Sequence, residues 1–391
     1  MSRIVVLGGA GIIGQAIVQD LAEDVPEVVV ADLDLAAAQR VVERIGRGCV
    51  AEQVDVTDPA RLDSVLFGAD ACINSAQYYF NLDVMMGCLR NHVPYMDLGG
   101  LFHTTRKQLE LADQFEVIGV TAILGLGSCP GVANVQAGYL GGMLDTVDAV
   151  KIYNGSTIDE GESLSWAYSI ETILDEISQP AMVFREGEFQ AMAPLGEEEY
   201  FMFPDPIGYA KTHLSLHSEV ATIPLSLGDK GIQECFFKIT FFGYSEPALR
   251  KMQFLSELGL ASKEPLEIKG VQVAPRDVLI ALLNRSPAAK TPPVNKGYKD
   301  IATVVSGTLD GRPVTLRMDT WAWPHERWGI SGSKLMVASP PAVVARWLAD
   351  GRLRKPGVWA PEQAVDGEAF FADLAERGIG SSLSREEVVA G

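Results

Sequence analysis

The stretch IVVLGGAGIIG at residues 4–14 decides how the rest of the chain is interpreted. An apolar run typical of a buried strand leads directly into three glycines in the pattern GxGxxG. Gly9 allows a tight turn, Gly11 lets the backbone approach a pyrophosphate, and Gly14 lets the next helix pack closely on the strand. The N-terminus of that helix would face the phosphates. The pattern therefore predicts a dinucleotide pocket.

The next strand favours one form of the dinucleotide. EVVVADLD ends at Asp32, which lies 18 positions beyond Gly14, where a carboxylate can meet the ribose hydroxyls. A carboxylate there repels a 2′-phosphate, so NAD is favoured over NADP, whereas Asp34 is expected to cap the following helix. The residues expected to bind the cofactor are Gly9, Gly11, Ile12, Ile13, Gly14, Asp32, Ser75 and Ala76.

Composition excludes several classes of partner. The chain has 391 residues, a net charge of −19 and a pI near 4.7, which argue against nucleic acid or an anionic membrane as partner. No apolar run reaches the length of a membrane span, and the first strand begins directly after MSR, so we expect a cytoplasmic protein. Five scattered cysteines predict neither a disulfide framework nor a metal site.

The order of elements predicts an α/β fold with two domains. Strands and helices alternate through residues 1–128, as in a doubly wound parallel Rossmann sheet. Longer, alternating strands in 129–336 predict an α+β domain with a mainly antiparallel sheet. Helical patterns return in 337–391, which we expect to complete the first domain.

Three segments should surround the nicotinamide, because ligands lie beyond the carboxyl ends of parallel strands. In SAQYYFN, Tyr78 is expected to wall the nicotinamide or transfer a proton, with simple packing as the alternative. In DLGG, Asp97 either contacts the ligand or forms a turn. In GLGSCPG, Cys129 is either a proton donor with a lowered pKa or a packed thiol.

The second domain offers further polar candidates. His213 and His217 are four residues apart and far from any cysteine. This spacing suits a metal only on a helix with a third ligand near, and the surrounding residues indicate a loop or strand, so a metal is not expected. A hydrogen bond to a substrate group is a better use for His217. Arg276 and Arg312 either pair with a substrate carboxylate or form surface salt bridges. The catalytic candidates are Tyr78, Asp97 and His217, with no metal.

Taken together, the motifs resemble the saccharopine dehydrogenase-like oxidoreductases, and within them the lysine 6-dehydrogenase branch. The resemblance covers most of the chain. It implies a Rossmann domain completed by C-terminal elements, a substrate and dimerisation domain, and hydride exchange at a carbon–nitrogen bond of an amino acid. It rests on GGAGIIG, ADLDLAAA, YMDLGG (95–100), LGSCPG (126–131), YSIE (168–171), PRDVLIALL (275–283) and KPGVWAPEQAVDGEAFFADLAERGI (355–379).

The resemblance implies an NAD-dependent dehydrogenase that deaminates a small-molecule substrate, lysine or a related amino acid, and acts as a homodimer or larger homo-oligomer. One alternative is a saccharopine- or carboxynorspermidine-type reductase, which joins an amine to a carbonyl acid by reducing the imine. Another is a sensor that binds NAD without turnover. The segment LHSEVATIPL (216–225) lacks the paired glycines of the lysine enzyme and gains Glu219, so the substrate stays open.

Overall fold

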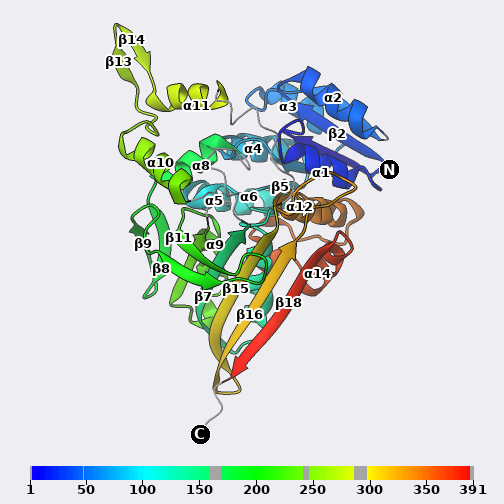
Figure 1. Ribbon diagram of the computed structural model, residues 1–391. Coiled ribbons are helices and arrows are strands. Elements are labelled where there is room, and N and C mark those ends of the chain that lie inside the picture. Colours follow the sequence, from blue (N-terminus) through cyan, green and yellow to red (C-terminus); the bar gives the residue numbers. More distant parts are fainter. Residues whose placement is uncertain (1, 47, 158–168, 241–245, 286–296, 388–391) are drawn as a thin grey trace.

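Two sheets, each with its own helices, make up the molecule, and a small hairpin projects from it (Figure 1). The computed structural model describes residues 2–46, 48–157, 169–240, 246–285 and 297–387. Among the helices of these residues, none is both long enough and apolar enough to cross a bilayer.

The first sheet confirms the predicted doubly wound architecture. Its seven strands are all parallel, in the order β17-β6-β5-β4-β1-β2-β3. Ile4 to Leu7 in β1 are completely buried, as expected for a strand covered on both faces. The strands are β1 (Arg3–Leu7), β2 (Glu27–Asp32), β3 (Cys49–Gln53), β4 (Ala71–Asn74), β5 (Tyr95–Asp97), β6 (Thr121–Ile123) and β17 (Gly357–Trp359).

N-terminal capping residues determine where two helices of the first domain begin. The Asp34 carboxylate accepts a hydrogen bond from the N–H of Ala37 (3.0 Å) at the start of α2, as the sequence predicts, and Asp58 caps α3 in the same way. On one face, Arg346 of α12 pairs with the buried Asp20 of α1 at 2.9 Å. The helices are α1 (Gly14–Leu21), α2 (Leu35–Ile45), α3 (Pro59–Leu66), η1 (Tyr78–Phe80), α4 (Asn81–Asn91), α5 (Leu101–Leu109), α6 (Ala112–Val117) and α12 (Gly332–Asp350).

The second sheet has nine strands and is mainly antiparallel, as predicted; β7 and β12 form its one parallel pair among the described residues. Its path is β10-β11-β12-β7-β15-β16-β18, and β8 and β9 extend from β12. The strands are β7 (Thr146–Ser156), β8 (Ala181–Arg185), β9 (Glu188–Met192), β10 (Glu199–Met202), β11 (Tyr209–Leu214), β12 (Glu234–Ile239), β15 (Lys299–Leu309), β16 (Arg312–Ala322) and β18 (Ile379–Glu387).

The remaining helices cover this sheet or join it to the first. A separate two-stranded hairpin, β13 (Leu266–Ile268) with β14 (Val271–Val273), lies at the far end of the molecule beside α11 (Figure 1). The helices are α7 (Val132–Gly142), α8 (Ile170–Ser178), α9 (Glu219–Ser226), η2 (Gly228–Lys230), α10 (Glu246–Glu257), α11 (Pro275–Arg285), α13 (Pro361–Ala364) and α14 (Gly367–Ala375).

The C-terminal segment is shared between the two sheets, which corrects the assignment of all of 337–391 to the first domain. Strand β17 does join the parallel sheet, where Val358 pairs with Ala122 of β6. Strand β18, in contrast, pairs with β16 of the second sheet from Ile379 to Glu387. Its pairing covers a strand edge that would otherwise stay open to other chains. The helical pattern expected near the end of the chain hid this strand.

Candidate functional site

The glycine turn is as tight as its sequence requires. A Cβ on Gly14 would lie 2.1 Å from the carbonyl oxygen of Gly8, and one on Gly9 would lie 2.9 Å from Val30 Cγ1, so side chains are excluded at both positions. The residue with a left-handed backbone is Gly8 (φ +70°), which takes over the turn role expected of Gly9.

The turn offers the groups that a dinucleotide needs. Within the described part of the chain, the backbone N–H groups of Ile12 and Ile13, just before α1, donate to no other atom. Unpaired N–H groups at a helix N-terminus suit a phosphate. Asp32 lies at the end of β2, where one carboxylate oxygen accepts from the N–H of Ala10 in the turn (3.0 Å). The turn therefore fits a pyrophosphate beside a ribose.

The next strand end closes the other side of this turn. The Ser75 hydroxyl donates to the carbonyl of Leu7 (2.7 Å), and a Cβ on Gly8 would lie 2.8 Å from the nitrogen of Ala76. All the residues predicted to bind the cofactor thus gather at the carboxyl ends of β1, β2 and β4.

Just after Ala76, Tyr78 and Tyr79 belong to a cluster of polar side chains that centres on Asp175. Both Tyr78 (2.8 Å) and Tyr79 donate their hydroxyls to the same carboxylate oxygen of Asp175, which is buried on α8. Arg276 of α11 donates to its other oxygen (2.6 Å), and Lys263 lies 3.3 Å away. We call these five side chains the tyrosine cluster.

The hydrogen bonds of the tyrosine cluster stabilise the charged form of Asp175. Burial raises the pKa of Asp175, but the hydrogen bonds from Arg276, Tyr79 and Tyr78 outweigh it and hold the pKa below its usual value. Burial and hydrogen bonding raise the pKa of Tyr78, so its hydroxyl keeps its proton. Tyr78 therefore donates a hydrogen bond to Asp175 in the second domain, so it does more than pack against its neighbours.

A cavity of about 650 Å³ opens beside the tyrosine cluster. Its volume lies in the range of small-molecule sites. It is lined by Tyr79, Glu171, Lys263, Arg276, Asp277, Ile280, Ala281 and Asn284.

A second cluster surrounds His217, at the start of α9. The Nδ1 atom of His217 lies 3.1 Å from a carboxylate oxygen of Glu219, and Nε2 lies 3.7 Å from Glu176 of α8. The ring stacks on Phe237 at 3.8 Å. Burial alone would lower the pKa of His217, but the two carboxylates outweigh burial and raise it above its usual value.

A lysine and a thiol complete this second cluster. Buried Lys299, the first residue of β15, donates to the hydroxyl of Ser128 (2.8 Å), and burial lowers its pKa. Burial and the nearby Glu219 raise the pKa of Cys129, so the interpretation of Cys129 as a donor with a lowered pKa is wrong. The histidine cluster, as we name it, comprises Ser128, Cys129, Glu176, His217, Glu219 and Lys299.

Several buried atoms of the histidine cluster and its loop lack partners. Among the described residues, His217 Nε2, one carboxylate oxygen of Glu219, and the hydroxyls of Ser215 and Ser218 make no hydrogen bond. Buried polar atoms are nearly always paired, so such a group of unpaired atoms indicates a place for a ligand. A Cβ on Gly99 would lie 3.4 Å from the Ser218 hydroxyl, which puts this loop against the carboxyl end of β5.

Asp97 is enclosed by the protein, which corrects the expectation of a catalytic role. Its side chain is fully buried, and burial raises its pKa. With both oxygens occupied, it holds the loops after β5 and β6 in place and has no atom left for a substrate. It accepts hydrogen bonds from the N–H groups of Gly99 (2.8 Å) and Gly125 (2.7 Å) and from the side chains of Tyr95 (2.8 Å), Gln108 (2.6 Å) and Asn81 (3.2 Å).

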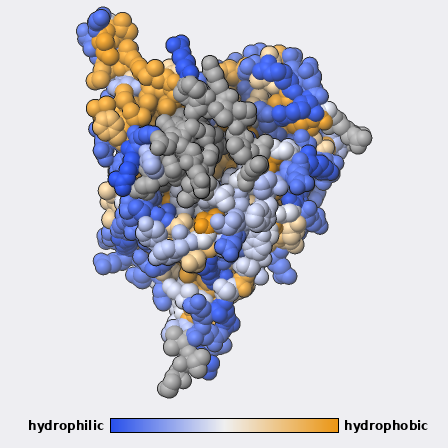
Figure 2. All heavy atoms as spheres, in the orientation of Figure 1, coloured by the Kyte–Doolittle hydropathy of each residue, from blue (hydrophilic) through white to orange (hydrophobic). Residues whose placement is uncertain are grey.

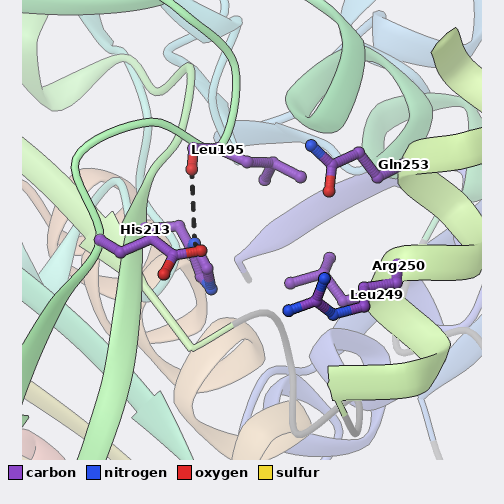
Figure 3. A pocket seen from close by; sticks show the side chains of 6 residues that line it. Leu195, His213, Leu249, Arg250 and Gln253 are labelled. Atoms are coloured by element: carbon purple, nitrogen blue, oxygen red, sulfur yellow. Dashed lines mark hydrogen bonds and ion pairs between the residues drawn. The ribbon is translucent and has the colours of Figure 1, made fainter.

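The other histidine lies in a different place. His213 lines a small pocket of about 70 Å³ beside α10, which it shares with Leu195, Leu249, Arg250 and Gln253 (Figure 3). Its Nδ1 lies 3.4 Å from the carbonyl of Leu195. This pocket shares no residue with the histidine cluster. The described part of the chain contains no group of His, Cys, Asp and Glu side chains arranged to hold a metal ion.

Among the members of the two clusters that were not foreseen from the sequence are three buried charges. Asp175 and Glu176 are adjacent acids within the apolar run ILDEI, a helix whose residues 173–177 are all buried. Lys299 is a buried cation at the start of β15, whose first five residues are all buried. Charges embedded in apolar runs were the available signal, since such residues are rarely buried without a function or a partner.

Comparison with known proteins identifies both halves of the molecule. Residues 4–123 match the saccharopine dehydrogenase NADP-binding domain, and residues 127–379 match the saccharopine dehydrogenase C-terminal domain. The chain is 24% identical to carboxyaminopropylagmatine dehydrogenase of Synechocystis, with 97% of this chain and 96% of the relative covered. It is 26% identical to carboxynorspermidine synthase of Vibrio cholerae, with 95% and 94% covered.

Solved structures share the fold. Saccharopine dehydrogenase (L-Glu forming) from Saccharomyces cerevisiae superposes with a TM-score of 0.74 at 17% identity, with all of both chains covered. A homospermidine synthase from Legionella pneumophila, solved in complex with NAD, superposes with a TM-score of 0.66 at 12% identity, with 98% of this chain and 91% of that one covered. The predicted nicotinamide cofactor is confirmed as NAD(P), and the chain belongs to the saccharopine dehydrogenase family of oxidoreductases.

Proposed function

We propose that this protein reduces the imine formed between an amine and a carbonyl acid, and so joins the two as a secondary amine. The observation that carries the proposal is the set of unpaired polar atoms in the histidine cluster, which lies at the carboxyl edge of the dinucleotide-binding sheet. Two relatives that match almost the whole chain support it. They are named for a carboxynorspermidine and a carboxyaminopropylagmatine, which are amines that carry a carboxyl group.

The proposed reaction balances in two steps. The amine and the carbonyl lose one water and form the imine, which takes up a proton to become an iminium. The reduced nicotinamide, when bound, supplies a hydride to the iminium carbon and leaves as NAD(P)⁺.

The side chains of the histidine cluster match what the iminium needs. A buried cation requires an acceptor, and Glu219 has one carboxylate oxygen without a donor among the described residues. The two carboxylates raise the pKa of His217, which favours its protonated form, and its Nε2, which makes no hydrogen bond among the described residues, can give a proton to the imine nitrogen. Lys299, which donates to the Ser128 hydroxyl, lies at the edge of the same site.

The tyrosine cluster would hold the rest of the substrate. No residue that lines its cavity belongs to the histidine cluster. Helix α8 nevertheless connects the two clusters, because Asp175 accepts from Tyr78 and Glu176 lies beside His217. Cations and carboxylates both line the cavity, as suits a substrate that carries an amino group and a carboxylate.

A second candidate is oxidative deamination of a lysine-type amino acid. The resemblance of YSIE (168–171) and PRDVLIALL (275–283) to the lysine 6-dehydrogenase branch favours it. In that direction the histidine cluster would take the proton of the amine. In either reaction, the carboxylate of Asp32 leads us to propose NAD over NADP. A cytoplasmic location also stays a prediction from the sequence.

Initial rates with purified protein distinguish the candidates. Oxidation of NADH and of NADPH would be followed in mixtures of an aldehyde acid and one amine, where the amine is a diamine, agmatine or lysine. The aldehyde acid alone and each amine alone are the controls. NAD⁺ reduction would be followed with lysine and with neutral amino acids. We expect NADH oxidation only when both partners are present. NAD⁺ reduction by lysine alone, with release of ammonia, would establish the second candidate, and no turnover in either direction would contradict both.

A further inference from the structure

Glu362, on the short helix α13 near the end of the chain, joins two helices that adjoin the histidine cluster. One of its carboxylate oxygens accepts a hydrogen bond from the Asn134 side chain of α7 (2.9 Å), and the other accepts from the Ser226 hydroxyl of α9 (2.9 Å). Asn134 also donates to the hydroxyl of Thr222 on α9 (3.2 Å). Three segments that are distant along the chain therefore meet in these four side chains, which we call the Glu362 network.

Asn134 connects the Glu362 network to the turn that carries Ser128 and Cys129. Its side chain is buried, and its oxygen accepts from the backbone N–H of Gly131 at the end of that turn (3.0 Å). Gly131 has a φ of +126°, and a Cβ there would lie 2.1 Å from the carbonyl oxygen of Gly127, so the turn is too tight for a side chain. The bond to Asn134 therefore holds the backbone that presents Ser128 and Cys129 to the site.

Thr222 and Ser226 connect the same network to α9, the helix that begins at Glu219. This helix has only eight residues, and it contains Pro224, which has no N–H to donate to the carbonyl four residues earlier. A helix this short is marginal when only its own backbone bonds support it. The hydrogen bonds of Thr222 and Ser226 to the rest of the network therefore help to hold α9 in place.

The two helices approach each other at the histidine cluster. Glu219 lies close enough to Cys129 to raise the pKa of its thiol, and its other oxygen lies 3.1 Å from Nδ1 of His217. On the far side of α7, the packing against α13 is equally close, because a Cβ on Gly138 would lie 2.6 Å from the carbonyl oxygen of Glu362. A shift of α9 relative to α7 would therefore change the contacts inside the histidine cluster.

We propose that Glu362 is a positioning residue for imine reduction, which fixes the spacing of α7 and α9 and so keeps the parts of the histidine cluster in register. Glu362 acts through Asn134, Thr222 and Ser226, and not by contact with the reacting atoms. The inference rests on the proposed function, because that function assigns the proton transfer to the histidine cluster.

Glu362→Ala and Glu362→Gln test this role. Alanine removes both acceptor oxygens, whereas the glutamine amide can accept from Asn134 through its oxygen and donate to the Ser226 hydroxyl through its nitrogen. We expect kcat to fall roughly tenfold to hundredfold in Glu362→Ala, because a small misplacement of reacting groups costs that much, with an unchanged KM for the nicotinamide cofactor. Glu362→Gln should restore most of the loss.

Two control variants show whether the effect is specific. Glu368→Ala removes an exposed carboxylate from the neighbouring helix α14. Val271→Ala changes a side chain that is 60% exposed, in the β13–β14 hairpin, where hydrophobic residues gather on the surface (Figure 2). We expect both variants to have the kcat of the wild type.

A second measurement needs no turnover. The chain has five histidines, so selective labelling lets NMR follow the ring signals of His217, which His217→Asn identifies. We expect these signals to shift in Glu362→Ala and to keep their wild-type positions in Glu362→Gln and Glu368→Ala. Thermal unfolding shows which variants are folded. If Glu362→Ala does not fold, Thr222→Val removes a single hydroxyl of the same network, and Thr222→Ser is its rescue.

Full activity in folded Glu362→Ala would overturn the inference, and so would equal losses of kcat in Glu362→Ala and Glu362→Gln. Unshifted His217 signals in Glu362→Ala would overturn it as well. A wild type that catalyses neither candidate reaction would contradict the proposed function, and the His217 signals would then decide by themselves whether Glu362 holds the histidine cluster in register.

Discussion

Two buried polar networks lie at neighbouring strand ends of this protein, around Asp97 and around His217, and they differ in how completely their atoms are paired. Both oxygens of Asp97 accept hydrogen bonds, from five donors in total. Around His217, Nε2 and a Glu219 oxygen have no hydrogen-bond partner among the described residues. Pairing therefore distinguishes a network whose carboxylate oxygens are both occupied from one with unpaired atoms, although a Cβ on Gly99, just after Asp97, would lie 3.4 Å from the hydroxyl of Ser218, the neighbour of His217.

Removing the proton carrier should have the largest effect on activity. His217→Asn keeps a polar side chain of similar size but cannot carry a proton at neutral pH. We expect kcat of imine reduction to fall by roughly 10² to 10⁴, the usual contribution of general acid catalysis. Stopped-flow NADH oxidation measures the rate. His213→Asn is the matched control, since that histidine lies outside the cluster. Equal losses in the two variants would contradict this role.

The opposite pattern is expected at Asp97. Asp97→Ala removes the acceptor that five donors share in a fully buried site, which should lower the free energy of unfolding by roughly 3 kcal/mol or more. Urea unfolding measures the loss, and Asp97→Asn, which retains an acceptor oxygen, should lose less. The activity of the fraction that folds should change little. If Asp97→Asn is instead as stable as the wild type but inactive, Asp97 belongs to the chemistry and the comparison fails.

A smaller effect is expected when one carboxylate beside His217 is neutralised. The carboxylates of Glu219 and Glu176 raise the pKa of His217, so protonated His217 persists to higher pH than an ordinary histidine. Reduction that needs this proton falls as the pH rises through that pKa. In Glu219→Gln the fall in kcat/KM should therefore occur at lower pH. Glu219→Asp, which keeps the charge, is the control, and an unshifted profile in Glu219→Gln would exclude His217 as the donor.

The smallest effect concerns Asp300, the neighbour of Lys299 on β15. Neither of its buried oxygens has a hydrogen-bond partner among the described residues, and burial and the adjacent Asp319 raise its pKa to about 8. The folded protein keeps this proton from about pH 4 to pH 8, while the unfolded chain has already released it, so stability should fall as the pH rises through that window. Thermal melts of Asp300→Asn should show a flatter pH dependence. An unchanged slope would mean that Asp300 has a partner that pairs its charge.

The sequence predicted the cofactor end of the molecule far better than the substrate end. The turn at Gly9 to Gly14 and the carboxylate at Asp32 lie within one strand–helix–strand unit, so the spacing along the chain fixes their positions in space. The histidine cluster instead joins Ser128, His217 and Lys299 from three distant segments. Their proximity depends on how the second sheet docks under the first, and no local pattern encodes that docking.

The same limit explains the individual errors. DLGG indicates a loop at a strand end, but only the fold shows that Tyr95 and Gln108 enclose Asp97. A lowered pKa at Cys129 required a helix N-terminus with no acid beside it, and Glu219 comes from ninety residues away. Strand β18 has a mixed polar sequence that becomes a strand because β16 offers it an edge.

Helix α8 contributes one residue to each of the two clusters, Asp175 to the tyrosine cluster and Glu176 to the histidine cluster. Successive residues on a helix point about 100° apart, so Asp175 and Glu176 look into different clusters while sharing one backbone. A rotation of α8 that changed the contacts of Asp175 in the tyrosine cluster would also move Glu176 away from His217. If the two clusters act as proposed, a movement of α8 affects together the part of the site that holds the substrate and the part that carries the proton.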